Sequence, residues 1–256
     1  MSVGRRIEEV RMAIMLLSRI RVWPQWPEVD PPNPRDIIWA LPLAGAAIGG
    51  LGALAYVLLV GLANVPESMA AIATLALMLL ATGALHEDGL ADTADGFGGG
   101  RTRERKLDIM RDSRIGTYGA LSLMLSLAWR GAAISLIADP GLVAGALVAC
   151  GALSRGAVVL MLARLPPARS DGLGVAFREI EIAQIGWGLA TASLIAVAVL
   201  PVSAAVLLAL AGVTTTLWFA SVARGQIGGY TGDTLGAVQQ LSECAMLLAL
   251  VALISG

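Results

Sequence analysis

The chain has 256 residues, of which 57% are hydrophobic and 14% are charged, with a net charge of −1 and a mean hydropathy of +0.76. Soluble domains average about 45–50% apolar and roughly 25% charged residues, so this composition excludes an ordinary soluble protein and indicates an integral membrane protein. The near-neutral charge provides no basic surface for nucleic acid. No polar linker divides the chain, so residues 1–256 are expected to form one membrane-embedded domain.

The amino-terminal segment combines charged residues with a short apolar face. Ile7, Val10, Ile14 and Leu17 recur at helical spacing, with arginine and glutamate between them. This pattern is typical of an amphipathic helix that lies in the membrane interface. The charges interrupt the apolar stretch and no small-residue cleavage pattern follows, which argues against a secretion signal. We therefore predict an interfacial helix at the amino terminus.

Seven apolar runs are candidates for membrane spans, since a spanning helix needs about 20 mostly apolar residues. They cover residues 36–63, 67–85, 115–138, 141–163, 183–200, 202–223 and 233–255. Short connectors alternate with longer, charged ones along the chain. The sequence therefore predicts an all-α, polytopic membrane bundle with about seven transmembrane helices.

The positive charges fall on one side of this predicted bundle. All 18 arginines and lysines except Arg130 and Arg155 precede the first span or lie in the three longer loops. The positive-inside rule makes that side cytoplasmic, so we expect a bacterial inner-membrane protein with a cytoplasmic amino terminus. Burying a charge within a span costs at least about 2.5–3.5 kcal/mol. Arg130 and Arg155 should therefore face the bundle interior, with Arg155 a candidate substrate ligand and a structural ion pair the alternative.

An acidic cluster follows the second apolar run, in the segment "HEDGLADTADGFGGG". Asp88, Asp92 and Asp95 are spaced i, i+4, i+7, which places them on one face of a helix that continues out of the second span. Like charges at this spacing repel each other, so the stripe predicts a bound divalent cation. Oxygen-only ligands indicate Mg²⁺ or Mn²⁺, with Glu87 as a further ligand. His86 is expected to be a polar residue at the interface, and a solvated charged loop is the alternative interpretation.

Basic residues come directly after the acidic cluster. Arg101, Arg111 and Arg114 are candidate ligands for substrate phosphates. Asp112 is the candidate general base and Asp95 the second candidate. Metal-binding carboxylates beside arginines are the ingredients of phosphoryl-group chemistry. The predicted membrane domain is therefore expected to be catalytic.

Two further segments on the same side carry polar residues among glycines. "ARSDGLG" contains Asp171 and "GGYTGDTLGA" contains Asp233, and Gln240 follows at the start of the last apolar run. Each segment alone is a weak signal, because Gly-Asp turns are common. Their shared side with the acidic cluster indicates that Asp171, Asp233 and Gln240 line the same substrate-binding site.

Four segments together resemble a known family. "HEDGLADTADG", "MRDSRIGTYG", "ARSDGLG" and "GGYTGDTLGA" are similar, in kind and order, to the signature segments of cobalamin synthases, the adenosylcobinamide-GDP ribazoletransferases. The resemblance extends over nearly the whole chain. It implies a Mg²⁺-dependent reaction in the cytoplasmic membrane that joins adenosylcobinamide-GDP to α-ribazole, or its 5′-phosphate, and releases GMP. Membrane lipid surrounds such an enzyme, and association with itself or with other membrane-bound enzymes of the cobalamin pathway is a hypothesis.

Two other functions compete with this interpretation. CDP-alcohol phosphotransferases of phospholipid synthesis share a D-x-x-D-G core, which Asp92, Asp95 and Gly96 match, but the Ala-Arg pair that follows in that family is absent here. A divalent cation transporter is the non-enzymatic alternative. Transporters usually bind their ions near the bilayer midplane, whereas these carboxylates are predicted at one face.

Overall fold

The computed structural model describes residues 3–22, 33–171, 173–178 and 180–256. Across this part of the chain the structure is all-helical, as predicted. The α-helices are α1 (Val3–Leu17), α2 (Leu41–Gly61), α3 (Glu67–Thr82), α4 (Leu85–Gly99), α5 (Arg103–Ile109), α6 (Thr117–Ile137), α7 (Pro140–Arg164), α8 (Ile182–Val199), α9 (Val202–Ile227) and α10 (Gly232–Ser255). Two short 3-10 helices, η1 (Ile38–Ala40) and η2 (Leu173–Phe177), precede α2 and α8.

Six of the described helices are long and apolar enough to cross a membrane, namely α2 with η1, and α6 to α10. The α3–α4 pair would add a seventh span only if the two were one segment, but they are bent by 89°. The prediction of a helix running straight from the second span into the acidic cluster is therefore wrong. Gly83 and Ala84 adopt left-handed backbone angles, with φ of 65° and 57°, and such angles end an α-helix. We place α4 beyond the bend and outside the membrane spans.

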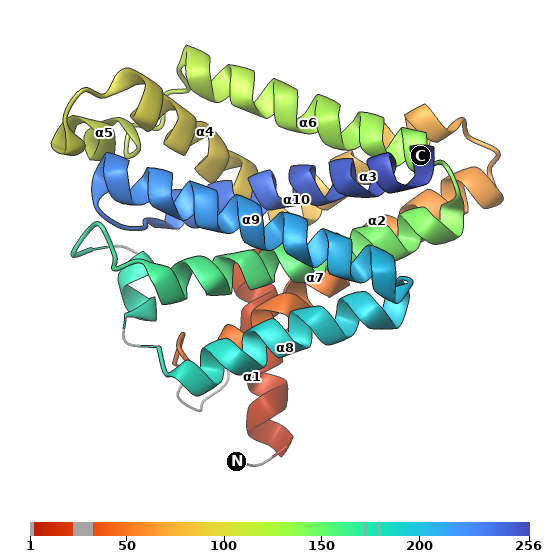
Figure 1. Cartoon of the computed structure of the whole chain (residues 1–256), viewed down its shortest axis with the longest axis horizontal. Coiled ribbons are helices and arrows are strands. Elements are labelled where there is room, and N and C mark those ends of the chain that lie inside the picture. The colour runs from red at the N-terminus through yellow and green to blue at the C-terminus, as the bar shows by residue number, and fades with distance from the viewer. Residues whose placement is uncertain (1–2, 23–32, 172, 179) are drawn as a thin grey trace.

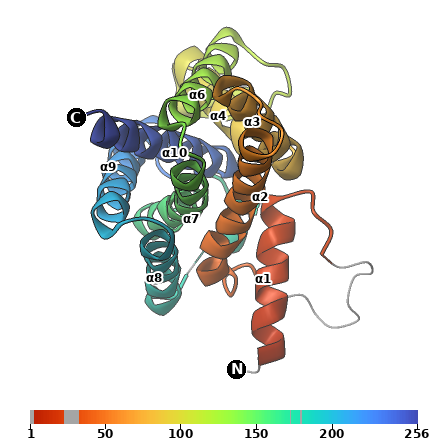
Figure 2. The same ribbon diagram turned by 90° about the vertical axis from the view of Figure 1, so that its right-hand side faces the viewer.

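The spans pack around α7 (Figures 1 and 2). In the most apolar stretch of α7, 78% of the residues are buried, a larger share than in any other candidate span of the described chain. Glycines bring α2 into close contact with it. A Cβ atom on Gly45 would lie 2.1 Å from the carbonyl oxygen of Gly151, and one on Gly49 would lie 2.2 Å from that of Leu147. Small residues permit such close approach between helices in lipid, so these glycines fix the centre of the bundle.

The outer surfaces of the spans are apolar. Leu80, Leu125, Leu194 and Trp218 are among many large hydrophobic side chains that the fold leaves exposed. Exposed apolar area of this extent suits lipid rather than water. The protein is therefore a multi-pass membrane protein.

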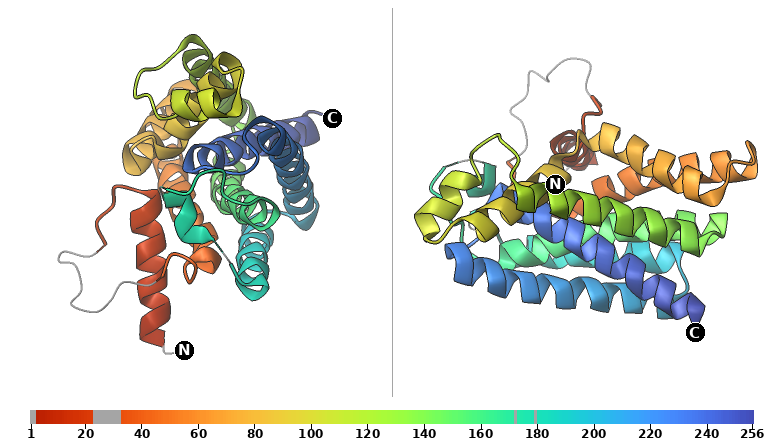
Figure 3. Two further views of the ribbon diagram at one scale, coloured as in Figure 1. Left: turned by 90° about the vertical axis from the view of Figure 1, so that its left-hand side faces the viewer. Right: turned by 90° about the horizontal axis from the view of Figure 1, so that it is seen from above.

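Helix α1 crosses the bundle at a steep angle instead of running along it (Figure 2). Its buried residue Glu9 accepts hydrogen bonds from Trp39 Nε1 at 2.7 Å and from Arg6 Nη1 at 2.8 Å. These contacts anchor α1 where α2 begins, in the orientation expected of an interfacial helix. At one end of the bundle, α4, α5 and the loops before η2 and α10 gather together (Figure 3).

Candidate active site

A cavity of about 380 Å³ opens at this end of the bundle. The last turn of α1, the first turn of α4, the end of α7, the loop that includes η2 and the first turn of α10 form its wall. Its polar lining consists of His86, Asp88, Arg169, Asp171, Thr231 and Asp233, and most of the remaining lining is apolar. The cavity therefore brings together three residues predicted from the sequence, Asp88, Asp171 and Asp233.

Two loops that are distant in sequence pair through their backbones where Arg169 lines the cavity. The amide of Ala168 donates to the carbonyl of Tyr230 at 2.7 Å, and the amide of Tyr230 donates to that of Pro166 at 2.9 Å. Gly229 permits this pairing, because a Cβ atom there would lie 2.2 Å from the carbonyl oxygen of Pro166. The pairing brings Arg169 to the beginning of α10.

Arg169 links α5 to the beginning of α10. Its Nη2 donates to the carbonyl of Leu107 at 2.9 Å, and its Nη1 lies 3.5 Å from Asp233 Oδ2. Its Nε is buried and has no partner among the described residues, whereas the side chain as a whole lines the cavity, where its charge would attract an anionic ligand. Arg169 belongs to the segment "ARSDGLG", two residues before Asp171, and this segment was expected to line the site.

The amino terminus of α10 fixes Asp233. Thr231 and Thr234 form a capping box, with N–O distances of 2.8 and 3.3 Å, which satisfies free backbone N–H groups. The Thr231 hydroxyl also donates to Asp233 Oδ2 at 3.2 Å. Gly89 allows α4 to pack tightly here, since a Cβ atom on it would lie 2.7 Å from the carbonyl oxygen of Asp233. This contact sets Asp88 and Asp233 on the same cavity.

Asp88 and Asp92 are the uncompensated acids of α4. Neither side chain makes a hydrogen bond or an ion pair with any residue that the structure describes. Burial and the nearby carboxylates of Asp88, Asp233 and Asp95 raise the pKa of Asp92 from 3.8 to about 7, with Arg169 opposing the shift. A raised pKa of this kind marks negative charge that lacks a counter-ion.

Asp95, the third acid of the predicted stripe, is bound to the protein itself. Its Oδ2 accepts from the amide of Gly116 at 2.7 Å and its Oδ1 from that of Gly119 at 2.8 Å. These amides belong to the first turn of α6, whose backbone N–H groups have no partner within the helix. Asp95 therefore caps α6, and neither of its oxygens is free of a hydrogen bond.

The acids were predicted to hold a divalent cation. Within the described part of the chain, no three histidine, cysteine or carboxylate side chains are arranged around one point. The donor set still fits a hard cation, because Asp88, Asp92 and Asp233 offer only oxygen ligands and their charges repel each other. A shared ion would require these side chains to turn toward it.

Asp112 and its neighbours lie in the partly exposed turn that follows α5. Asp112 forms an ion pair with Arg114 at 2.6 Å, and hydrogen bonds from the side chain and amide of Arg114 lower the Asp112 pKa to about 2. Arg111 pairs with Asp171 at 2.7 and 2.8 Å, across the mouth of the cavity. Arg101 is exposed and lines no cavity found in the described chain.

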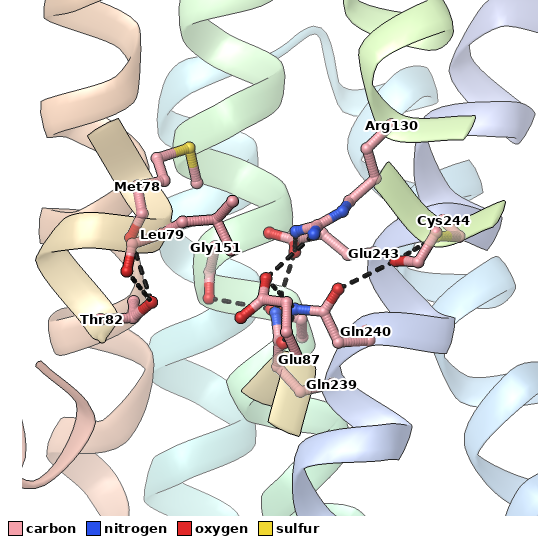
Figure 4. Close-up of polar contacts among 12 residues, drawn as sticks. Met78, Leu79, Thr82, Glu87, Arg130, Gly151, Gln239, Gln240, Glu243 and Cys244 are labelled. Carbon is pink, nitrogen blue, oxygen red and sulfur yellow. Dashed lines mark hydrogen bonds and ion pairs between the residues drawn. The ribbon is translucent and has the colours of Figure 1, made fainter. Parts of the chain in front are cut away.

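Other predicted site residues lie in a separate polar network inside the bundle (Figure 4). Arg130 contacts Glu87 Oε1 at 2.9 Å and Glu243 Oε2 at 3.3 Å. Gln240 Nε2 donates to Glu87 Oε1 at 2.9 Å, and Gln239 Nε2 donates to Glu243 Oε2 at 3.0 Å. Glu87 and Gln240 therefore belong to this network and do not line the large cavity.

Arg155 belongs to the same network. Its Nη1 donates to Ser154 Oγ at 3.1 Å and to the carbonyl of Gly151 at 3.4 Å. His86 is buried between the network and the large cavity and lines both. The expectation that His86 is a polar interface residue is therefore wrong, because α10 covers it.

The fold and the cavity together define a class of protein. It is a polytopic helical membrane protein with a cavity that aspartates and an arginine line. The chain is a member of the cobalamin-5-phosphate synthase family, whose profile matches residues 9–251. It is thus a transferase of cobalamin biosynthesis.

Several relatives carry the same name, adenosylcobinamide-GDP ribazoletransferase. The protein from Bradyrhizobium diazoefficiens is 44% identical over 250 residues, which cover 96% of this chain and 94% of that protein. The protein from Mesorhizobium japonicum is 48% identical over 217 residues, covering 82% and 81% of the two chains. No solved structure matches the chain.

Proposed function

We propose that the chain joins adenosylcobinamide-GDP to α-ribazole, or its 5′-phosphate, and releases GMP. Its relatives are named for a reaction of this kind. The observation that carries the proposal is that Asp88, Asp233 and Arg169 line one cavity and that Asp92 lies near all three. Carboxylates in excess beside an arginine suit a diphosphate that arrives with a divalent metal ion.

In this proposal a ribose hydroxyl of α-ribazole attacks the phosphorus atom attached to cobinamide. A new P–O bond forms, the P–O bond to GMP breaks, and the hydroxyl proton passes to a carboxylate. Asp112 is a weak base, because its pKa is about 2 and Arg114 occupies it. Asp95 already accepts two hydrogen bonds. Asp88 and Asp92 are therefore better placed to accept the proton, through a carboxylate oxygen that the metal ion leaves free.

Mg²⁺ is the proposed cofactor, with Asp88, Asp92 and Asp233 as its ligands. Bound there, it would neutralise charge on the diphosphate and on the departing phosphate. Arg169, whose side chain lines the cavity, would bind a phosphate oxygen through its guanidinium group. Arg111 is bound to Asp171 through its Nη2 atom, which places its guanidinium beside a residue that lines the cavity.

The cavity accommodates part of the substrate. Its volume of about 380 Å³ lies near the lower end of the roughly 300–1,000 Å³ range of pockets for drug-sized ligands, and a corrinoid is larger than a drug. We therefore place the diphosphate and ribose in the cavity, with the corrin ring outside its mouth. The apolar side chains of Leu16, Leu41 and Phe177 would contact the less polar parts of the substrate.

The proposed location is the bacterial cytoplasmic membrane, with the cavity facing the cytoplasm. The support for this orientation is the gathering of the arginine-rich loops at the cavity end (Figure 3). Both nucleotide substrates would then reach the site from the compartment in which such compounds are made.

The experiment is a GMP-release assay with purified protein, both substrates and varied Mg²⁺. The wild type should release GMP and form a cobalamin only when Mg²⁺ is present, and Asp92→Asn should lower this rate at least about 100-fold. Asp108→Asn is the matched control, because Asp108 is exposed on α5 and lines no cavity found in the described chain. Turnover of CDP-diacylglycerol with an alcohol would instead indicate a CDP-alcohol phosphotransferase. Cation uptake into vesicles that contain the protein would indicate a cation transporter.

A further inference from the structure

Four charged residues lie buried inside the bundle and do not line the large cavity. Three of them are labelled in Figure 4. Glu87, Arg130, Arg155 and Glu243 are 7%, 3%, 3% and 4% exposed. They come from α4, α6, α7 and α10, and their formal charges sum to zero. A buried charge in a membrane bundle is costly unless it is paired, so the network requires all four members.

Glu87 and Asp88 are neighbours in sequence, about 100° apart around α4, and they lie in different surroundings. Glu87 is buried against Arg130 and Gln240, whereas Asp88 is exposed and lines the cavity. A smaller cavity of about 10 Å³ adjoins Glu87 and Arg155. Glu87 Oε2 and Arg155 Nε have no partner there among the described residues, and the space is sufficient for about one water molecule.

Backbone packing and side-chain contacts together hold the first turn of α4, where Gly89 lies close to Asp233. The helix begins after the bend at Gly83, and the preceding residue, Ala84, is left-handed and supplies no side-chain cap. Glu87 adds the side-chain contacts of this turn with α6 and α10, which oppose its rotation about the helix axis. Because Asp88 and Asp92 follow on the same helix, that rotation determines where their carboxylates point.

We propose that Glu87, Arg130 and Glu243 are positioning residues that orient the acids of α4 toward the cavity, and that Glu87 is not a metal ligand. This inference rests on the proposed function, since it assigns Asp88 and Asp92 to the site. Removing one charge leaves its partner buried without compensation, whereas removing an opposite pair restores neutrality. The effects of single and paired substitutions should therefore be non-additive.

The test compares Glu87→Gln, Arg130→Gln and the double variant with the wild type. The matched control is Glu104→Gln, since Glu104 is an exposed glutamate on α5. Each single variant should lose roughly 10- to 100-fold in kcat for GMP release, as expected for a misplaced catalytic group, with little change in KM. The double variant should recover most of that loss. Mn²⁺ binding, followed by the EPR signal of the free ion, should weaken to the same small extent in both single variants.

A selective loss of Mn²⁺ affinity in Glu87→Gln, with normal binding in Arg130→Gln, would make Glu87 a ligand and overturn the inference. Additive losses in the double variant, or unchanged kcat in both single variants, would overturn it as well. If Arg130→Gln does not accumulate in membranes, Arg130→Lys retains the charge but cannot bridge both glutamates, and it should lose part of the activity. Absence of GMP release by the wild type would instead refute the proposed function, while the Mn²⁺ comparison could still be made.

Discussion

The carboxylate of Asp95 lies against the backbone of Gly119, where its Oδ1 accepts the Gly119 amide at 2.8 Å. A Cβ atom on Gly119 would lie only 2.3 Å from Asp95 Oδ2, so the contact requires a glycine. We expect Gly119→Ala to destabilise the protein by about 1–3 kcal/mol, because the carboxylate must move away from α6. A lowered thermal midpoint in detergent, compared with Gly186→Ala on the open side of α8, would bear this out. An unchanged midpoint would contradict the contact.

The raised pKa of Asp92 predicts how stability depends on pH. Its value is 3.8 ordinarily and about 7 in the fold, so the folded protein holds this proton more tightly than the unfolded chain. The associated stability is present below about pH 4 and is lost as the pH rises to about 7. We expect the thermal midpoint of metal-free protein to fall between pH 5 and 8, and to fall less in Asp92→Asn.

Scanning fluorimetry in EDTA would measure the fall in thermal midpoint for the wild type and for Asp92→Asn. Mg²⁺ should reverse the fall in the wild type at pH 8 by binding the ionised carboxylate of Asp92. The prediction is wrong if both proteins show the same pH dependence.

Asp112 was predicted from the sequence to be the general base, and its surroundings argue for a smaller role. A carboxylate with a pKa of about 2 that is bonded to Arg114 is a poor acceptor at neutral pH. General-base catalysis is worth roughly 10²–10⁴-fold. We expect Asp112→Asn to reduce kcat less than about tenfold and to leave the acidic limb of the pH–rate profile in place. A loss within the larger range would restore Asp112 as the base.

Arg169 should contribute to substrate binding through its guanidinium group, because its side chain lines the cavity. Loss of a charged hydrogen bond costs about 1.5–3 kcal/mol, which corresponds to a reduction of roughly ten- to a hundredfold in kcat/KM. We expect this for Arg169→Gln, whereas Arg105→Gln, at an exposed position of α5, should behave like the wild type. Equal kinetics for the two variants would exclude Arg169 from the site.

The apolar runs predicted the spans well, because in lipid a helix must satisfy its own backbone groups and its length follows from membrane thickness. The run at 115–138 became α6, Thr117–Ile137, and the run at 202–223 became α9, Val202–Ile227. The bend after α3 was not predicted. Gly83 was a usable signal, but the left-handed angle of Ala84 is unusual for a residue with a Cβ atom.

The site was only partly predictable. Helical spacing placed Asp88 and Asp92 one turn apart on α4, and periodicity alone justified that step. Contacts between segments that are distant in sequence determine where the carboxylates of the other acids lie. Asp95 is held by amides more than 20 positions along the chain, and Glu87 by Arg130. The interior position expected for Arg130 is confirmed, but its partners depend on packing that periodicity does not encode.

Leu16 and Leu17, on the last turn of α1, form one wall of the large cavity. The amino-terminal helix is therefore part of the cavity wall. A bulky amino-terminal fusion or a short-chain detergent that displaced α1 would thus open the cavity on that side.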